Sequence, residues 1–112
     1  MILVDTSAWT EYLRGTGSGA HFRLRELLAG SRTETDDLLL RRMLAALDHV
    51  PTDAVDWETA ARLHRTCQRQ GEQVWSLSDC LVAAVAIRIG APVLAHDRDF
   101  VLLARHTDLE LA

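Results

Sequence analysis

The most constraining feature of the chain is an apolar segment at residues 2–4 that ends on Asp5, Thr6 and Ser7. Three consecutive apolar residues, two of them β-branched, leave no polar face and therefore predict a strand buried on both sides in a parallel sheet. Asp5, Thr6 and Ser7 then lie at the carboxyl end of that strand, the edge where open α/β sheets bind their ligands. Asp5 is therefore either a functional carboxylate or the N-cap of the following helix.

Apolar residues at helical spacing predict helices along most of the remaining chain. The predicted segments cover residues 7–13, 20–29, 33–47, 55–69, 76–89 and 100–105. Segment 76–89 is apolar almost all round, which indicates a central and buried helix. Gly90 is expected to end this helix, because glycine readily adopts the left-handed conformation that ends many helices.

Further strands are expected at residues 49–55, 92–95 and 109–112, the last as a short edge strand. Pro51 favours extended backbone in the first of these segments. Strands that alternate with helices are typical of a parallel sheet in an α/β fold. A chain of 112 residues with 48% hydrophobic content can bury one such core, so we expect residues 1–112 to form a single domain.

The sequence also indicates where in the cell the protein is located. No apolar run reaches the roughly 18 residues that a membrane span needs, and Asp5 interrupts the first apolar residues too early for a secretory signal. We therefore expect a cytoplasmic protein that does not contact a membrane. Cys67 and Cys80 form no CxxC pair, so we expect both to be reduced thiols in the core.

The charge of the chain restricts how it can meet nucleic acid. The formal charge is -4, with 16 acidic residues against 12 basic ones, all of them arginine. Such a chain cannot attract RNA by bulk charge, so metal ions would have to neutralise part of the phosphate charge. The acidity also suits a basic protein partner. Arg62, Arg65 and Arg69 recur at helical spacing, either as a solvated face or as a nucleic-acid or partner surface.

Acidic side chains follow two of the predicted strands, Asp5 after the first and Asp97 with Asp99 after a later one. The carboxyl ends of parallel strands open on the same edge of a sheet, so these carboxylates can meet. Asp79 joins them from the start of a helix, where Ser76 and Asp79 have the spacing of a capping box. Asp79 is therefore a cap, a metal ligand that the helix dipole keeps ionised, or both.

Carboxylates gathered in one site repel, and each raises the pKa of its neighbours. Hard divalent cations remove that penalty, and an all-oxygen site with room for water suits Mg²⁺ or Mn²⁺. Such ions activate water for in-line attack on a phosphodiester, which points to a nuclease. The sequence has neither a glycine-rich phosphate loop nor a serine and histidine pairing typical of a triad. His96 lies beside Asp97 without a nucleophile, and we expect a structural or supporting role for it.

Three stretches carry a resemblance to a known family: MILVDTSAW, SLSDCLVAAVAIRIGAPVLAHDRDF and ARHTDLEL. Together they resemble the PIN-domain toxins of type II VapBC toxin-antitoxin modules, over nearly the whole chain. The resemblance implies a PIN-like three-layer α/β fold and a magnesium-dependent endoribonuclease that cleaves structured RNA such as transfer or ribosomal RNA. It also implies inhibition by a VapB-type antitoxin and, as is common in the family, a homodimer.

The resemblance also implies roles for individual residues. Asp5 in VDTS resembles the first metal ligand, and Thr6 or Ser7 the neighbouring hydroxyl that contacts substrate or supports the ligand. Asp79 in SLSDC resembles the acid of the SLxDC motif. In HDRDF, Asp97 resembles a ligand and Asp99 an outer contributor to the metal site. The resemblance thus implies that Asp5, Asp79 and Asp97 are catalytic.

Two departures from the family pattern stand out. Trp75 precedes the SLSDC motif where the family usually has arginine, which bears on contacts with RNA or antitoxin. Compared with the family pattern, the chain is also shortened between its second and third helices, so a sheet of about 3–4 strands with one strand missing is expected. Glu26 is then either the metal-site glutamate or a surface residue of an earlier helix. If Glu26 points away from the other acids, a degenerate toxin that binds an antitoxin without cleaving RNA becomes the alternative.

Overall fold

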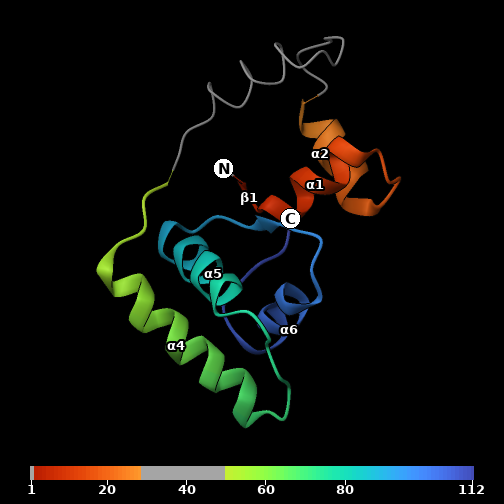
Figure 1. Cartoon of the computed structure of the whole chain (residues 1–112). Coiled ribbons are helices and arrows are strands. Elements are labelled where there is room, and N and C mark those ends of the chain that lie inside the picture. Colours follow the sequence, from red (N-terminus) through yellow and green to blue (C-terminus); the bar gives the residue numbers. More distant parts are fainter. Residues whose placement is uncertain (1, 29–49) are drawn as a thin grey trace.

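The computed structural model describes residues 2–28 and 50–112 (Figure 1). The elements in chain order are β1 (Leu3–Val4), α1 (Thr6–Arg14), α2 (Gly19–Leu28), α4 (Ala54–Arg69), α5 (Leu77–Ile89), β2 (Val93–Leu94) and α6 (Arg98–His106). Each helix or strand falls within two residues of a segment that the sequence predicts. The helix expected over residues 33–47 lies outside the described residues.

The sheet joins the two ends of the chain. β1 and β2 are parallel, with Leu3 opposite Val93 and Val4 opposite Leu94. The amide of Asp5 extends this pairing by donating to the carbonyl of Leu94 at 2.9 Å. Because Asp5 ends β1 beside the end of β2, the segment that leads to Asp97 starts next to it.

Side chains alternate across this sheet and reach two different cores. Leu3 and Val93 belong to the core formed with α4, α5 and α6. Val4 and Leu94 face the opposite way and pack with α1 and α2. In Figure 1 the strands accordingly lie between the α1–α2 pair and the group of α5 and α6, with α4 packed outside α5. The predicted α/β fold with a reduced sheet is confirmed.

The prediction of a strand at residues 49–55 is wrong for residues 50–55, the part of the segment that the structure describes. Residues 50–53 are irregular, and α4 begins at Ala54. The reason is a local helix signal: the amide of Asp53 donates to Oδ2 of Asp56 at 2.8 Å, which is one half of a capping box. Pro51 keeps the preceding backbone out of the helix without making it a strand.

The remaining edge of the sheet is short. Leu111 forms a single parallel bridge with Val93, so the edge strand expected at residues 109–112 contributes one bridge. Within residues 2–28 and 50–112 the sheet therefore has two strands, where about 3–4 were expected. A pocket opens between β1, the start of α1, α5 and the two residues Val50 and Thr52.

The central helix α5 follows its sequence signals closely. Ser76 is its N-cap, with the Oγ accepting from the amide of Asp79 at 3.2 Å, and Gly90 ends it with a φ of 69°. Cys80 on α5 and Cys67 on α4 are buried free thiols, as predicted. Within the described part of the chain, no helix is both long and apolar enough to span a membrane.

Candidate metal centre

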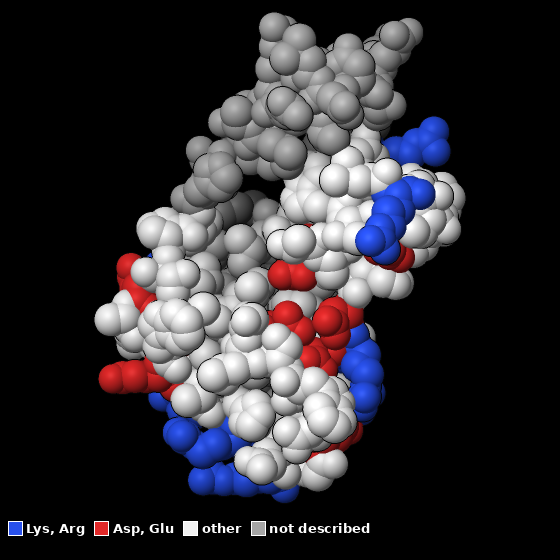
Figure 2. Space-filling view, viewed as in Figure 1, with Lys and Arg blue, Asp and Glu red and all other residues white. Residues whose placement is uncertain are grey.

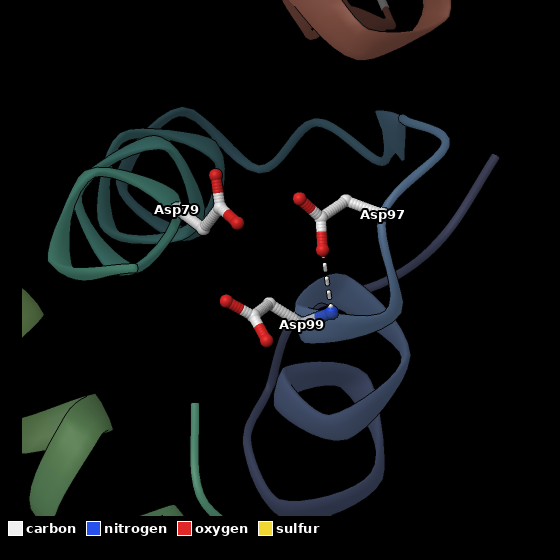
Figure 3. A group of neighbouring side chains, drawn as sticks. All are labelled: Asp79, Asp97 and Asp99. Atoms are coloured by element: carbon white, nitrogen blue, oxygen red, sulfur yellow. Dashed lines mark hydrogen bonds between the residues drawn. The ribbon is translucent and has the colours of Figure 1, made fainter. Parts of the chain in front are cut away.

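Three carboxylates meet where α5 and α6 begin. Asp79 comes from the first turn of α5, Asp97 from the N-cap of α6 and Asp99 from its first turn, and one ligand oxygen of each lies within 4.8 Å of the others. Figure 3 shows the three side chains turned toward one another. Asp97 is also held locally, because its Oδ1 accepts from the amide of Asp99 at 3.0 Å. The structure thus brings together acids that are far apart in the sequence.

Asp79 is the least satisfied member of this group. Its Oδ2 is buried and has no hydrogen-bond partner among the described residues. Burial first, and then the negative charges of Asp97, Asp5 and Asp99, raise the pKa of Asp79 to about 7. Burial and the neighbouring acids thus oppose the helix dipole, which favours the ionised form of this carboxylate.

These observations fit a divalent cation. A buried carboxylate oxygen without a donor is costly, and a cation would supply the partner that residues 2–28 and 50–112 do not. The donor set contains only carboxylate oxygens, which hard ions such as Mg²⁺ and Mn²⁺ prefer. Asp79 and Asp97 are the residues placed to hold such an ion.

Asp99 has a different set of partners. It is 3% exposed, and its Oδ2 accepts from the amides of Trp75 at 3.1 Å and of Ser76 at 2.9 Å. In a complete capping box the third helical residue, Asp79, would accept from the amide of Ser76. Asp99 takes that place from another helix, so the predicted box forms only in its Ser76 half. The carboxylate of Asp79 is thereby left without this donor and faces Asp97.

Asp5 is both a cap and a neighbour of the group. Its Oδ2 accepts from the amide of Ser7 at 3.0 Å and from the Ser7 hydroxyl at 2.7 Å, so the N-cap interpretation is confirmed. The same hydroxyl oxygen accepts from the amide of His96 at 2.8 Å, which ties the end of β1 to the segment after β2. Asp5 lies outside the 4.8 Å group, yet its charge contributes to the raised pKa of Asp79. Thr6 is exposed at the start of α1.

The structure does not bring Glu26 to the other acids. The Glu26 side chain is 71% exposed and pairs with Arg23 at 3.3 Å on the surface of α2. The reason is the packing of α2: Leu24 is buried in the core beside α1, and Glu26, two residues later, lies on the opposite face of the helix. This placement matches the surface alternative that the sequence left open.

A further acid near the site, Glu11, was missed by the sequence reading. Its Oε1 lies 3.1 Å from Nε2 of His96, and its side chain is only 16% exposed. Glu11 follows Ser7 by four residues on α1, so both side chains lie on the same face of the helix. That spacing is the signal that could have placed Glu11 near the strand ends.

The surface around the group is acidic. Figure 2 shows acidic side chains gathered in the middle of this face, below the α1–α2 pair. Arg98 is exposed between the two aspartates of α6. Arg62, Arg65 and Arg69 are all exposed on α4, as both interpretations of their spacing require.

Comparison with known proteins gives the family. A model of the PIN domain matches residues 31–106. The chain is 39% identical over 131 positions to VapC ribonuclease Mb1587 of Mycobacterium bovis and to Ribonuclease VapC11 of Mycobacterium tuberculosis, covering the whole chain and 98% of each relative. The chain therefore belongs to the PIN-domain family, among the VapC ribonucleases. Since it has 112 residues against 131 compared positions, the relatives carry residues without a counterpart here, in agreement with the predicted internal deletion.

Proposed function

We propose that the protein is the toxin of a type II toxin-antitoxin module and hydrolyses RNA phosphodiester bonds with Mg²⁺, or Mn²⁺ in its place. The observation that carries this proposal is the buried, unpartnered Oδ2 of Asp79 within a group of carboxylates. The names of the relatives, which are ribonucleases, supply the substrate class. Asp5, Asp79 and Asp97 are the proposed catalytic residues.

Each residue has a distinct task in this proposal. A bound divalent cation would supply activation of a water molecule and neutralisation of the charge on the attacked phosphate. Asp79 and Asp97 would hold it, with Asp5 contributing from the adjacent strand end. Ser7 fixes the orientation of Asp5 through its two hydrogen bonds, and the exposed Thr6 is placed to meet substrate.

The overall reaction is a simple hydrolysis. The oxygen of one water molecule bonds to phosphorus while the bond from phosphorus to the leaving ribose oxygen breaks, and the water proton ends on that leaving oxygen. Asp99 acts beside this chemistry by fixing the backbone before α5. We assign it the outer position in the metal site and leave Glu26 out of the set of ligands.

The proposed partners follow from the family and the charge. We propose a cytoplasmic location, where the RNA substrate and an antitoxin would both be met. The acidic face suits a basic segment of a VapB-type antitoxin. A homodimer is the proposed assembly.

The test is cleavage of RNA by the purified protein with and without Mg²⁺. We expect Mg²⁺-stimulated cleavage that is lost in Asp5→Asn and in Asp79→Asn. Asp108→Asn is the matched control, because Asp108 is exposed and outside the carboxylate group. Cleavage that persists in both site variants would contradict the assigned residues, and equal activity in EDTA would contradict the metal mechanism.

A second candidate function is favoured by the position of Glu26. Because this glutamate is exposed and paired with Arg23, the site holds fewer acids than the resemblance implies. The alternative is a catalytically degenerate protein that binds an antitoxin without cleaving RNA. Titration calorimetry with Mg²⁺ separates the two: the nuclease binds the ion through Asp79, whereas the degenerate protein binds an antitoxin but shows neither Mg²⁺ binding nor cleavage.

A further inference from the structure

We propose that the indole of Trp75 is a stacking platform for an unpaired nucleobase of the RNA, next to the phosphate that is cleaved. This inference rests on the proposed function and adds a substrate-binding residue to it. Trp75 has the most exposed large apolar side chain in the described part of the chain, at 76%. An exposed indole offers its full face to a base, whereas a buried one could not.

Hydrogen bonds place the backbone of Trp75 beside Asp99, one member of the carboxylate group. Its amide donates to Oδ2 of Asp99 at 3.1 Å, and the next amide, of Ser76, donates to the same oxygen at 2.9 Å. Ser76 in turn caps α5 by accepting from the amide of Asp79 at 3.2 Å. A base stacked on Trp75 would therefore belong to a nucleotide at or beside the attacked phosphate.

The segment that carries Trp75 is fixed on both sides. Val74 is 1% exposed and packs in the main core, so the side chain that follows it points outward from an extended segment. Glu72, two residues earlier, accepts from Arg105 of α6 at 2.6 Å. These contacts hold the backbone that carries Trp75 in place before substrate arrives, which lowers the entropy cost of binding.

The charge of this face favours stacking over phosphate contacts. The carboxylates repel the phosphates of an RNA backbone. Arg98, between Asp97 and Asp99 in the sequence, is an exposed basic residue next to them. Stacking of a base on an aromatic ring needs no positive charge and occurs with every base. Proteins that recognise RNA commonly stack bases that have been splayed out of a helix, which is the form of substrate this platform fits.

The test is equilibrium binding in an Asp79→Asn background, in which we expect no cleavage. Fluorescence anisotropy with Mg²⁺ compares a short labelled oligouridylate with an abasic ribose-phosphate chain of the same length. We expect Trp75→Ala to weaken oligouridylate binding about 5- to 100-fold and to leave binding of the abasic chain unchanged. Trp75→Phe should retain most of the affinity, whereas Trp75→Leu, which keeps apolar surface without an aromatic face, should behave like Trp75→Ala.

Trp57→Ala is the matched control, because Trp57 is also exposed, at 57%, but lies on α4. It should leave both probes bound as in the parent protein, with an unchanged salt dependence. Oligouridylate binding that is unchanged in Trp75→Ala overturns the inference while leaving the proposed function intact. An equal loss for both probes also overturns it, since the ring would then act through the loop and not through a base.

Two other outcomes reject the inference for different reasons. If the Asp79→Asn protein with Trp75 intact binds neither probe, the inference is rejected, whereas the proposed function is judged separately by Mg²⁺-stimulated cleavage by the protein without substitutions. If Trp75→Ala leaves RNA binding unchanged but weakens self-association in sedimentation equilibrium, the residue belongs to an interface between copies. Trp75→Phe and Trp75→Leu decide the matter if Trp75→Ala does not fold, because both keep a large apolar side chain.

Discussion

Asp56 on α4 and Asp79 on α5 occupy the same local position, the third residue of a helix, in very different surroundings. Asp56 is 1% exposed and accepts from Nε of Arg88 at 3.0 Å and from the amide of Asp53 at 2.8 Å. The Arg88 guanidinium, with the backbone amide, holds the pKa of Asp56 below its usual range. Asp79 has no such donor, and its pKa rises to about 7.

The comparison separates a structural acid from a functional one. Both positions favour an acidic residue for the same local reason, the partial positive charge of a helix N-terminus. At α4 the fold adds an ion pair between the buried Asp56 and the partly exposed Arg88, which satisfies the carboxylate and joins α4 to α5. At α5 the fold adds other acids, and the amide of Ser76 donates to Asp99 instead, which leaves Oδ2 of Asp79 without a hydrogen-bond partner among the described residues.

The largest effect expected from this comparison is on Asp79. Asp79→Asn should lower the rate of RNA cleavage by about 100-fold or more, since even residues that only support a metal ligand cost about 10- to 100-fold when removed. The same change should raise the melting temperature of the metal-free protein at pH values above about 7, because the amide carries no charge to repel its neighbours. Cleavage assays and thermal unfolding in EDTA measure the two effects. A lower melting temperature without loss of cleavage would show that Asp79 is the structural acid.

Asp56→Asn should have the opposite pattern. Removing one partner leaves the Arg88 charge without its buried counter-ion, so we expect a melting temperature lower by roughly 10 °C. Cleavage per folded molecule should stay within about two-fold of the parent, since Asp56 contacts no member of the carboxylate group. Combining Asp56→Asn with Arg88→Gln should cost less than the two changes added together, because they share one interaction. Strictly additive losses would contradict the proposed pairing.

The pH dependence of stability should distinguish the two acids. The folded pKa of Asp79 is raised from 3.8 to about 7, so its stabilising contribution is full below about pH 4 and is lost as the pH rises to about 7. The folded pKa of Asp56 is lowered, so its contribution is present above about pH 4 and is lost as the pH falls further.

Thermal unfolding in EDTA across this range provides the measurement. Asp79→Asn should remove the decline between about pH 4 and 7, and Asp56→Asn should weaken the loss at lower pH. Since Mg²⁺ competes with the proton on Asp79, the ion should stabilise the parent protein more at pH 8 than at pH 6. If Mg²⁺ stabilises the protein equally at pH 8 and at pH 6, Asp79 does not bind the ion.

The smallest effect is expected at Asp99, which supplies the capping acceptor that Asp79 does not. Asp99→Ala removes two backbone hydrogen bonds and should lower the melting temperature by about 5 °C. Asp99→Asn keeps an acceptor oxygen and should cost less. Differential scanning calorimetry of the metal-free variants measures both. Equal losses in the two variants would indicate that the charge of Asp99 matters, and not its hydrogen bonds.

Much of the fold could be predicted because its signals are local. The apolar run of β1, the caps of α5 at Ser76 and Gly90, and the apolar face of α4 each depend on residues a few positions apart. The meeting of Asp79 with Asp97 could also be expected, because parallel strands open on one edge. The irregular segment at residues 50–53 was missed, since proline excludes helix without requiring a strand.

The sequence by itself determined which residues begin and end the elements and which acids lie at the strand ends. Only the tertiary structure decided what each acid contacts. Asp56 finds Arg88, the amides of Trp75 and Ser76 find Asp99, and α2 turns Glu26 into solvent. These partners are distant in the sequence, so the packing of one helix against another selects them. That packing leaves Oδ2 of Asp79 buried without a partner among the described residues, although the local sequence of Asp79 resembles that of a helix cap.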